Sequence, residues 1–337
     1  MVRSALMRCV QLVGTAKLVD ADAGTPPLRD GEIRVAVHAA GICHSDAHYR
    51  RGMGNITYPR TLGHEVAGVV AELGPGVEAV RIGDRVAIHY LRSCGACERC
   101  VHSGEQFCVE GAMFGKELDG GYAESIVVPA VNAIPIPDDV PLEVAAVMMC
   151  STATAYHALR IADMREGARV LILGFGGLGY SALQLARALG AATIGVVDLV
   201  PEKLALARSL GAIALTEIAG EYDIALDFAG HPALSVAALR ALAPGGRLVV
   251  VALSEAPLDF NPYRDVLAKE RRIIGSSDHT REELVALLQL ASEGRIDLAP
   301  VITRRIELSA DAINGALDEL DRGTAGLRTV ISSAGRK

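Results

Sequence analysis

The hydrophobic pattern changes character near the middle of the chain. Up to about residue 150, short apolar runs typical of β-strands are separated by Gly and Pro, as in residues 32–39, 65–73, 85–90 and 122–128. This pattern predicts a β-rich, barrel-like domain with loops between its strands.

From about residue 168, apolar runs alternate with Ala- and Leu-rich segments of helical length. The runs cover residues 169–173, 192–197, 223–228, 247–251 and 272–275, and the helical segments cover residues 178–189, 201–210, 232–243 and 281–292. Such alternation is typical of repeated βα units, which form a parallel sheet. Runs as continuously apolar as RVLIL favour a sheet covered by helices on both faces.

The last part of the chain returns to a mixed pattern, with strand-like runs at residues 303–308 and 329–332 around a helical stretch at 310–320. The fold class predicted is therefore α/β, with two domains. Residues 151–292 form a doubly wound parallel sheet, and residues 1–150 together with 293–337 form the β-rich domain.

Composition and charge exclude several classes of protein. Half of the 337 residues are hydrophobic and 22% are charged, which suits well-packed cores and excludes a disordered chain. The net charge of −7 comes without any block of basic residues, so nucleic acid is not expected as a partner. No apolar run approaches the roughly 18 residues that span a bilayer. We therefore expect a cytoplasmic protein with no membrane partner.

A glycine pattern marks a dinucleotide site. Gly174, Gly176 and Gly179 follow an apolar strand directly and precede a helix. In this arrangement one glycine makes a tight turn, the next admits the pyrophosphate, and the third allows close packing of helix on strand. Gly177 and Leu178 then place free N–H groups at the positive end of the helix dipole, where phosphates bind.

The acidic residue Asp198 ends the next apolar strand, nineteen residues beyond Gly179. A carboxylate at about this offset accepts the ribose hydroxyls and repels a 2′-phosphate, so NAD is predicted rather than NADP. Lys203 lies within reach of the same ribose. The alternative is that Asp198 only caps the helix expected from Pro201.

Four cysteines lie within fifteen residues: Cys94, Cys97, Cys100 and Cys108. Four thiolates at this spacing can converge on one tetrahedral ion, which predicts a structural zinc site. Disulfides are disfavoured in a reducing compartment. An iron–sulfur cluster is a further alternative, but its usual motif closes with a shorter spacing and a proline.

Two further cysteines and a histidine, Cys43, Cys150 and His64, lie in separate loops. Three protein ligands leave a coordination position for substrate, which is typical of a catalytic zinc. Each residue also has a plainer interpretation, because a lone cysteine is commonly a small buried residue and a lone histidine commonly a hydrogen-bonded polar one.

Together these motifs occur in a characteristic order: Cys43 to Asp46 with His48, Gly63 to Glu65, the four-cysteine segment, Cys150 with Thr154, and the glycine pattern with Asp198. In this the chain resembles the zinc-dependent medium-chain alcohol dehydrogenases over nearly its whole length. The resemblance implies a GroES-like catalytic domain joined to a Rossmann domain, with the active site in the cleft between them and two zinc ions per chain.

Several roles follow from the resemblance. It implies that Cys43, His64 and Cys150 hold the catalytic zinc, that Glu65 lies just behind it as an occasional ligand, and that Asp46 orients His64.

The resemblance also implies a proton relay and further cofactor contacts. Ser45 takes the hydroxyl proton of the substrate and passes it through the cofactor ribose to His48. His44 approaches the cofactor phosphates, and Thr154 belongs to the cofactor site. The alternative for Ser45 is a hydrogen bond to a loop backbone, and the alternative for His48 is a surface histidine with no part in the relay.

The predicted function is NAD-dependent oxidation of a primary or secondary alcohol. The zinc-bound alkoxide transfers hydride to NAD, and the reverse reaction reduces an aldehyde or ketone. The alternatives are a polyol, threonine or formaldehyde dehydrogenase of the same family, or a non-catalytic NAD-binding zinc protein. The chain departs from its relatives in lacking tryptophan, and Tyr90 is expected to line the pocket. A homo-oligomer, tetramer or dimer, is expected from the family.

Overall fold

The computed structural model describes residues 6–102 and 104–332. By the contacts between its residues, the chain divides into two units. The first contains the chain up to Cys150, Thr280–Glu293 and the chain from Leu298, and the second contains Ser151–His279 and Gly294–Asp297. The structure thus groups residues 280–292 with the first unit, whereas the sequence analysis placed them in the dinucleotide-binding domain, and it groups Gly294–Asp297 with the second unit, whereas the sequence analysis placed them in the β-rich domain.

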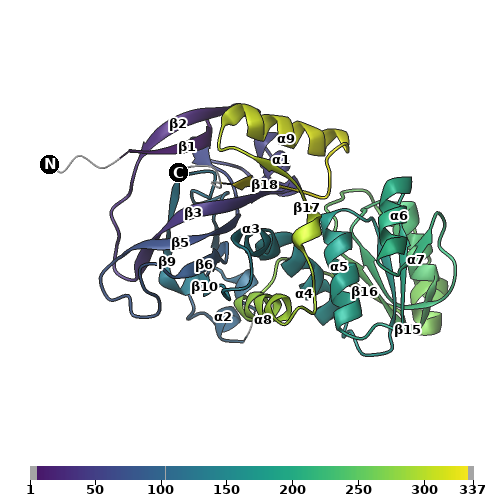
Figure 1. The fold of residues 1–337 in the computed structure, drawn as a ribbon. Coiled ribbons are helices and arrows are strands. Elements are labelled where there is room, and N and C mark those ends of the chain that lie inside the picture. Colours follow the sequence, from purple (N-terminus) through teal and green to yellow (C-terminus); the bar gives the residue numbers. More distant parts are fainter. Residues whose placement is uncertain (1–5, 103, 333–337) are drawn as a thin grey trace. The chain divides into compact units, whose positions relative to one another are not determined.

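The second unit is built on a parallel sheet with the strand order β13-β12-β11-β14-β15-β16. This is the order of a doubly wound dinucleotide-binding fold, and it confirms the predicted fold class. The strands are β11 (Arg169–Leu173), β12 (Thr193–Val197), β13 (Ile213–Leu215), β14 (Tyr222–Asp227), β15 (Leu242–Val250) and β16 (Arg272–Gly275). The helices, all labelled in Figure 1, are α4 (Ala153–Ile161), α5 (Gly177–Ala188), α6 (Pro201–Ser209) and α7 (Pro232–Arg240).

One boundary in this unit differs from the prediction. Helix α7 ends at Arg240 and β15 begins at Leu242, although a helix to residue 243 was expected. The residue before Pro244 is disfavoured in helical backbone, so the helix cannot continue through this segment. Gly245, at φ +73°, carries the chain through the irregular start of the strand.

The first unit contains a seven-stranded sheet with the order β10-β6-β5-β3-β18-β17, in which β9 also pairs with β3. A three-stranded sheet, β2-β1-β4, and the short pair β7-β8 complete it. The strands are β1 (Leu6–Leu12), β2 (Leu18–Gly24), β3 (Glu32–Ile42), β4 (Arg60–Thr61), β5 (Glu65–Leu73), β6 (Arg85–Ile88), β7 (Leu91–Arg92), β8 (Ala112–Met113), β9 (Ser125–Pro129), β10 (Ala133–Pro135), β17 (Ile302–Ile306) and β18 (Arg328–Ser332).

The helices of the first unit connect distant parts of the chain. They are α1 (His44–Arg50), α2 (Glu98–Val101), α3 (Leu142–Val147), α8 (Arg281–Ser292) and α9 (Ala310–Arg322). Figure 1 shows α9, in yellow, running close to α1 and β2. Ile313 and Leu317 of α9 pack in one core with Ala47 of α1 and Ile331 of β18. The C-terminal part of the chain therefore supports the helix that begins at Cys43.

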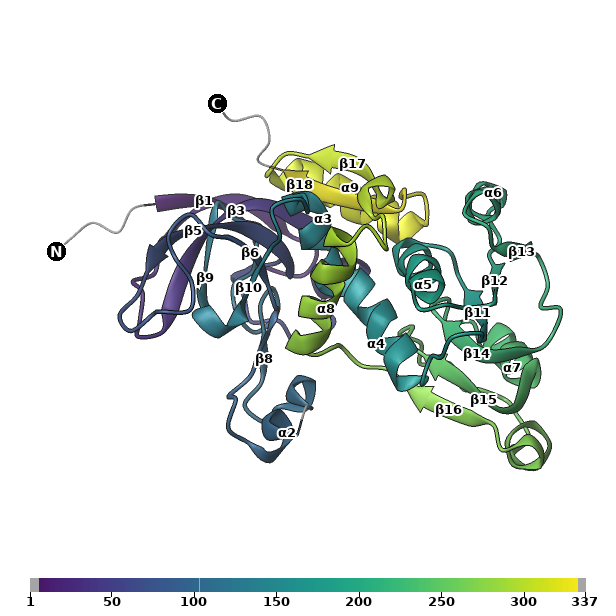
Figure 2. The same cartoon turned by 60° about the horizontal axis from the view of Figure 1, so that its bottom comes forward.

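The four-cysteine segment forms a lobe closed by β7 and β8, and Figure 2 shows this lobe, with α2, standing out from the strands of its own unit. The lobe also contacts α8, because Glu105 accepts a hydrogen bond from the backbone N–H of Arg281. Among the described residues, no helix combines the length and the apolar character needed to cross a membrane.

Candidate active site and metal centres

Helix α1 begins at Cys43, whose extended backbone makes it the N-terminal cap. Its backbone N–H donates to Asp46 Oδ2 at 3.0 Å, and the hydroxyl of Tyr122 donates to the same oxygen at 2.9 Å. Asp46 is fully buried, so its charge depends on these donors for solvation. The carboxylate is thereby fixed at the start of the helix.

The other oxygen of this carboxylate, Oδ1, lies 3.3 Å from His64 Nδ1. The contact implied by the resemblance between Asp46 and His64 is therefore present. Gly63, at φ +92°, turns the chain just before the histidine, and an added Cβ there would lie 2.4 Å from the ring of Tyr122. Only glycine fits this turn without displacing that ring.

The ligand atoms of Cys43, His64, Glu65 and Cys150 all lie within 4.8 Å of one another. The Sγ atoms of Cys43 and Cys150 are 3.9 Å apart, close to the edge of about 3.8 Å expected for a zinc tetrahedron with 2.3 Å Zn–S bonds. Cys150 lies in a π-helical turn, Met148–Thr152, that follows α3. Such turns occur frequently at functional sites.

The electrostatics of this cluster suit a cation. A hydrogen bond from Cys150 lowers the pKa of the Cys43 thiol well below its usual value, which favours the thiolate form that binds metal ions. Burial opposes the charged form of His64, but Asp46 outweighs burial and keeps the pKa of His64 well above its usual value. His64 Nε2 is buried and has no hydrogen-bond partner among the described residues. Two thiols and this nitrogen fit a zinc ion.

Glu65 is fully buried directly after His64, and its partner is Arg328 of β18. Burial raises the pKa of Glu65 to about 7, although the charge of Arg328 opposes the shift. Only Oε2 bonds to the guanidinium, and Oε1 is buried without a hydrogen-bond partner in the described structure. Gly41 makes room for this carboxylate, since a Cβ there would lie 1.8 Å from Oε2. Sequence reasoning missed Arg328, which carries no motif.

Tyr90 lies against the same histidine. Its ring packs edge-on to the ring of His64 with a centroid distance of 5.2 Å. The side chain is buried, so it forms part of the wall around the cluster.

The four lobe cysteines also converge. Their Sγ atoms lie 3.5 Å apart for Cys97 and Cys100, and 3.9 Å apart both for Cys94 and Cys100 and for Cys97 and Cys108. These separations are near the same tetrahedral edge of about 3.8 Å. The backbone N–H of Cys100 lowers the pKa of Cys97 to about 6, which favours the thiolate that a metal requires.

The predicted relay residues lie on α1. Ser45 and His48 are half-buried, and the exposed His44 ring is 6.4 Å from the His48 ring. Burial, Arg51 and His44 lower the pKa of His48, so this imidazole is neutral at neutral pH. A neutral imidazole is able to accept a proton.

The glycine turn of the second unit has the geometry expected for phosphate binding. Gly174 has φ +87°, and a Cβ on Gly179 would lie 2.1 Å from Gly174 O, so helix α5 packs directly on the turn. A Cβ on Gly176 would meet nothing within 4 Å. The backbone beside Gly176 is therefore open, as an approaching pyrophosphate requires. Gly177 and Leu178 form the first turn of α5.

Asp198 holds two backbone segments together at the end of β12. Its Oδ2 accepts from the N–H of Phe175 in the glycine turn at 2.7 Å, and its Oδ1 accepts from Val200 N–H at 2.9 Å. Val200, not Asp198, is the N-terminal cap of α6. The half-buried Lys203 follows in the first turn of that helix, and Thr154 is half-buried in α4.

Comparisons with known proteins agree with this geometry. The family model described as an alcohol dehydrogenase GroES-like domain matches residues 29–138, and the model described as a zinc-binding dehydrogenase matches residues 177–293. An alcohol dehydrogenase of Geobacillus stearothermophilus is 36% identical over 323 residues, which cover 91% of this chain and 93% of the relative. The chain belongs to the zinc-dependent medium-chain alcohol dehydrogenases.

Other members of the family differ in cofactor. A protein of Mycolicibacterium smegmatis named NADP-dependent alcohol dehydrogenase C 1 is 33% identical over 90% of each chain. Among solved structures, the alcohol dehydrogenase TADH of Thermus sp. ATN1 is similar with a TM-score of 0.90 and 29% identity, covering 97% of this chain and 99% of that one. Membership of the family therefore supports an alcohol dehydrogenase type of enzyme. It does not decide between NAD and NADP, so the cofactor has to be inferred from the residues of this chain.

Proposed function

We propose that this protein is a zinc-dependent alcohol dehydrogenase that uses NAD to oxidise primary or secondary alcohols, and that it reduces the matching aldehydes or ketones in reverse. The observation that carries the proposal is the buried cluster of Cys43, His64, Glu65 and Cys150, whose ligand atoms lie within 4.8 Å of one another. Arg328 already pairs with Glu65, so the donors that are left for a metal ion are the two thiols and the Nε2 of His64, which has no hydrogen-bond partner in the described structure.

The residues divide the work as follows. Cys43, His64 and Cys150 would hold the zinc. When bound, zinc would supply a Lewis acid for the alcohol or carbonyl oxygen, and NAD would supply an acceptor for hydride. Ser45 takes the hydroxyl proton of the substrate. His48, neutral and half-buried on the same helix, receives the proton and releases it to solvent.

We propose NAD as the cofactor because Asp198 ends β12 with a carboxylate. The 2′-phosphate of NADP would meet this negative charge, whereas the ribose hydroxyls of NAD can donate to it. The two bonds from backbone N–H groups leave each oxygen of Asp198 one further acceptor position. Asp198→Ala is expected to lower kcat/KM for NAD and to reduce the preference for NAD over NADP. Equal efficiency of the unsubstituted enzyme with both cofactors would contradict the assignment.

The decisive experiment combines a substrate panel with metal counting on the purified protein. Short, branched and aromatic alcohols are offered with NAD, and the zinc content per chain is measured in the same preparation. We expect NAD-linked turnover and two zinc ions per chain. Ser45→Ala should abolish turnover and leave NAD affinity near that of the unsubstituted enzyme. Iron in place of zinc, or two zinc ions without turnover of any alcohol, would reject the proposal.

The proposal extends to assembly and location. The family precedent supports a homo-oligomer, tetramer or dimer, and the sequence pattern supports the cytoplasm. Analytical ultracentrifugation of the purified chain measures the first, and fractionation of the producing cells measures the second.

A further inference from the structure

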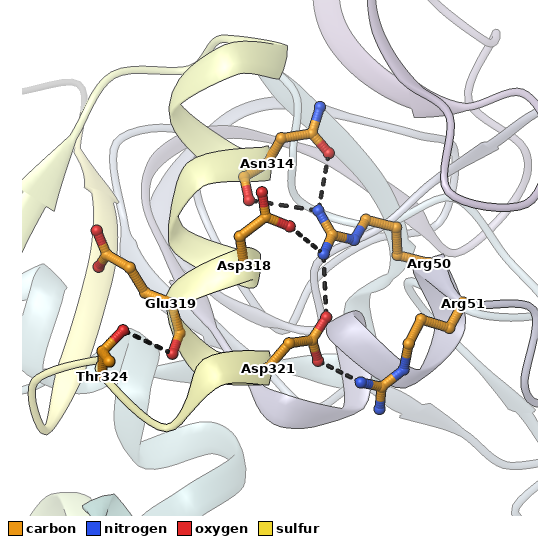
Figure 3. A network of polar contacts seen from close by, with 7 residues as sticks. All are labelled: Arg50, Arg51, Asn314, Asp318, Glu319, Asp321 and Thr324. Carbon is orange, nitrogen blue, oxygen red and sulfur yellow. Dashed lines mark hydrogen bonds and ion pairs between the residues drawn. The ribbon is translucent and has the colours of Figure 1, made fainter.

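Two arginines at the end of helix α1, Arg50 and the C-terminal cap Arg51, are held by α9. Figure 3 shows Arg50 and Arg51 reaching from α1 to the acidic side of that helix. The five residues of this contact, which we call the α1–α9 clasp, are Arg50, Arg51, Asn314, Asp318 and Asp321. The clasp joins segments about 270 residues apart in the sequence.

Arg50 forms the inner half of the clasp. Its Nη2 donates to Asp318 Oδ1 at 2.6 Å and to Asp321 Oδ2 at 3.1 Å, while its Nη1 donates to Asn314 Oδ1 at 3.1 Å. The residue is 7% exposed, so these ion pairs are shielded from solvent more than ordinary surface pairs. The inner half therefore fixes the end of α1 against α9.

Arg51 forms the outer half, through an ion pair of its Nη1 with Asp321 Oδ1. Arg51 follows His48 by three residues, a spacing that places side chains as neighbours on a helix. Arg51 is the C-terminal cap of α1 and its backbone N–H bonds to Ala47 O, so this spacing places Arg51 beside His48 on the helix surface. Asp321 neutralises Arg51 from α9, and its other oxygen is occupied by Arg50.

The charges around His48 come from two segments. Arg51, His44 and Cys43 act on it from its own segment, and Asp321 acts from α9. Arg51 and His44 disfavour the protonated imidazole, while Cys43 and Asp321 favour it. The two members of one ion pair therefore act on His48 with opposite sign.

We propose that Arg51 and Asp321 are positioning residues for the proton relay, and that their ion pair sets the protonation equilibrium of His48 from outside the substrate and metal sites. This inference deepens the proposed function, because it assumes that His48 accepts the substrate proton. It assigns α9 a part in the reaction, although no motif marks that helix.

The experiment compares Arg51→Gln and Asp321→Asn in the zinc-loaded full chain. Removing the positive charge should raise the pKa of His48 and move the acid limb of kcat/KM for alcohol oxidation to higher pH. Removing the negative charge should move the limb to lower pH. Because Arg51 is half exposed, both shifts should shrink as the salt concentration rises.

Asp318→Asn is the matched control. It removes a carboxylate of the same clasp that bonds to Arg50 alone, so it should lower stability without moving the limb. A purely structural clasp predicts no opposite shifts of the limb, although Asp321→Asn loses two ion pairs and each of the other two variants loses one. Shifts in one direction only, or equal shifts for Asp318→Asn and Asp321→Asn, would overturn the proposal.

A second readout separates this proposal from the proposed function. NMR titration of ¹³C-histidine-labelled protein, with His48→Gln to assign the signal, reports the pKa of His48 directly. If that pKa shifts in opposite directions in the two variants while the activity profile stays unchanged, the ion pair does set the protonation of His48, but His48 is not part of the relay. No shift of the His48 signal in either variant would overturn the inference, whatever the activity.

Discussion

Asp46→Asn is expected to weaken the proposed zinc site of Cys43, His64 and Cys150 without changing its shape. The substitution keeps the size of a fully buried side chain and removes only its charge. Oδ2 accepts from Cys43 N–H and from the hydroxyl of Tyr122. Because the backbone N–H can only donate, the amide oxygen of an asparagine must take this position.

The amide nitrogen then faces His64 Nδ1 across the present 3.3 Å contact. If Nδ1 carries the proton, it and the amide nitrogen are both donors and cannot bond. If Nε2 carries the proton instead, Nδ1 can accept from the amide, but Nε2 can then no longer bind the metal. Loss of such a partner of a metal-bound histidine typically costs 10–100-fold in metal affinity. This corresponds to about 1.4–2.7 kcal/mol.

The assay is dialysis against zinc buffered by a chelator over a range of free concentrations, followed by metal counting per chain. The lobe site serves as an internal reference, because Asp46 does not contact its cysteines. Tyr122→Phe is the graded control, since it removes one donor and keeps the carboxylate, and a smaller loss is expected. An Asp46→Asn protein that binds both zinc ions as tightly as the unsubstituted chain would refute this reasoning.

Two further predictions concern the lobe and the glycine turn. Cys97→Ser should lower the zinc content from two ions to one and expose the lobe to protease, whereas Cys9→Ser, at a buried cysteine outside both clusters, should keep both ions. Gly179→Ala should destabilise the second unit by about 1–3 kcal/mol in thermal unfolding, because its Cβ would lie 2.1 Å from Gly174 O. Gly176→Ala has open space around its Cβ, so it should unfold like the unsubstituted protein and lose NAD affinity in a binding titration. Equal melting temperatures of the two glycine variants, or two zinc ions in Cys97→Ser, would contradict these predictions.

The features that sequence patterns predicted without the family resemblance are local ones. The glycine turn lies within six residues, and the lobe cysteines lie within fifteen, so spacing fixes which atoms can meet. The parallel sheet was predictable for a related reason, because each βα unit repeats one pattern of apolar strand and amphipathic helix.

The features that sequence did not predict are contacts between distant segments. Glu65 and Arg328 are 263 residues apart, and Tyr122 and Asp46 are 76 residues apart. No periodicity relates an arginine in an apolar strand to a carboxylate that follows a histidine. The pairing depends on the antiparallel register of β18 on β3, which tertiary packing decides.

The position of α8 was missed for a similar reason. Its sequence continues the helical texture of the preceding βα units, and its boundaries, Arg281–Ser292, agree with the pattern. Its contacts, however, are made with the first unit, through Glu105 of the lobe and Val131 O. Local pattern identifies a helix and does not identify the surface that the helix covers.

The pairing of β18 with β3 has a consequence for synthesis of the protein on the ribosome. Most of the second unit, Ser151–His279, is one uninterrupted stretch of chain, whereas the main sheet of the first unit needs β18 between β3 and β17. During translation, some 260 further residues are synthesised after Glu65 before Arg328 is present and can pair with it. Cys43 and His64 are therefore synthesised long before the main sheet of the first unit can be completed, which leaves an interval in which the proposed zinc ion can reach them in the nascent chain.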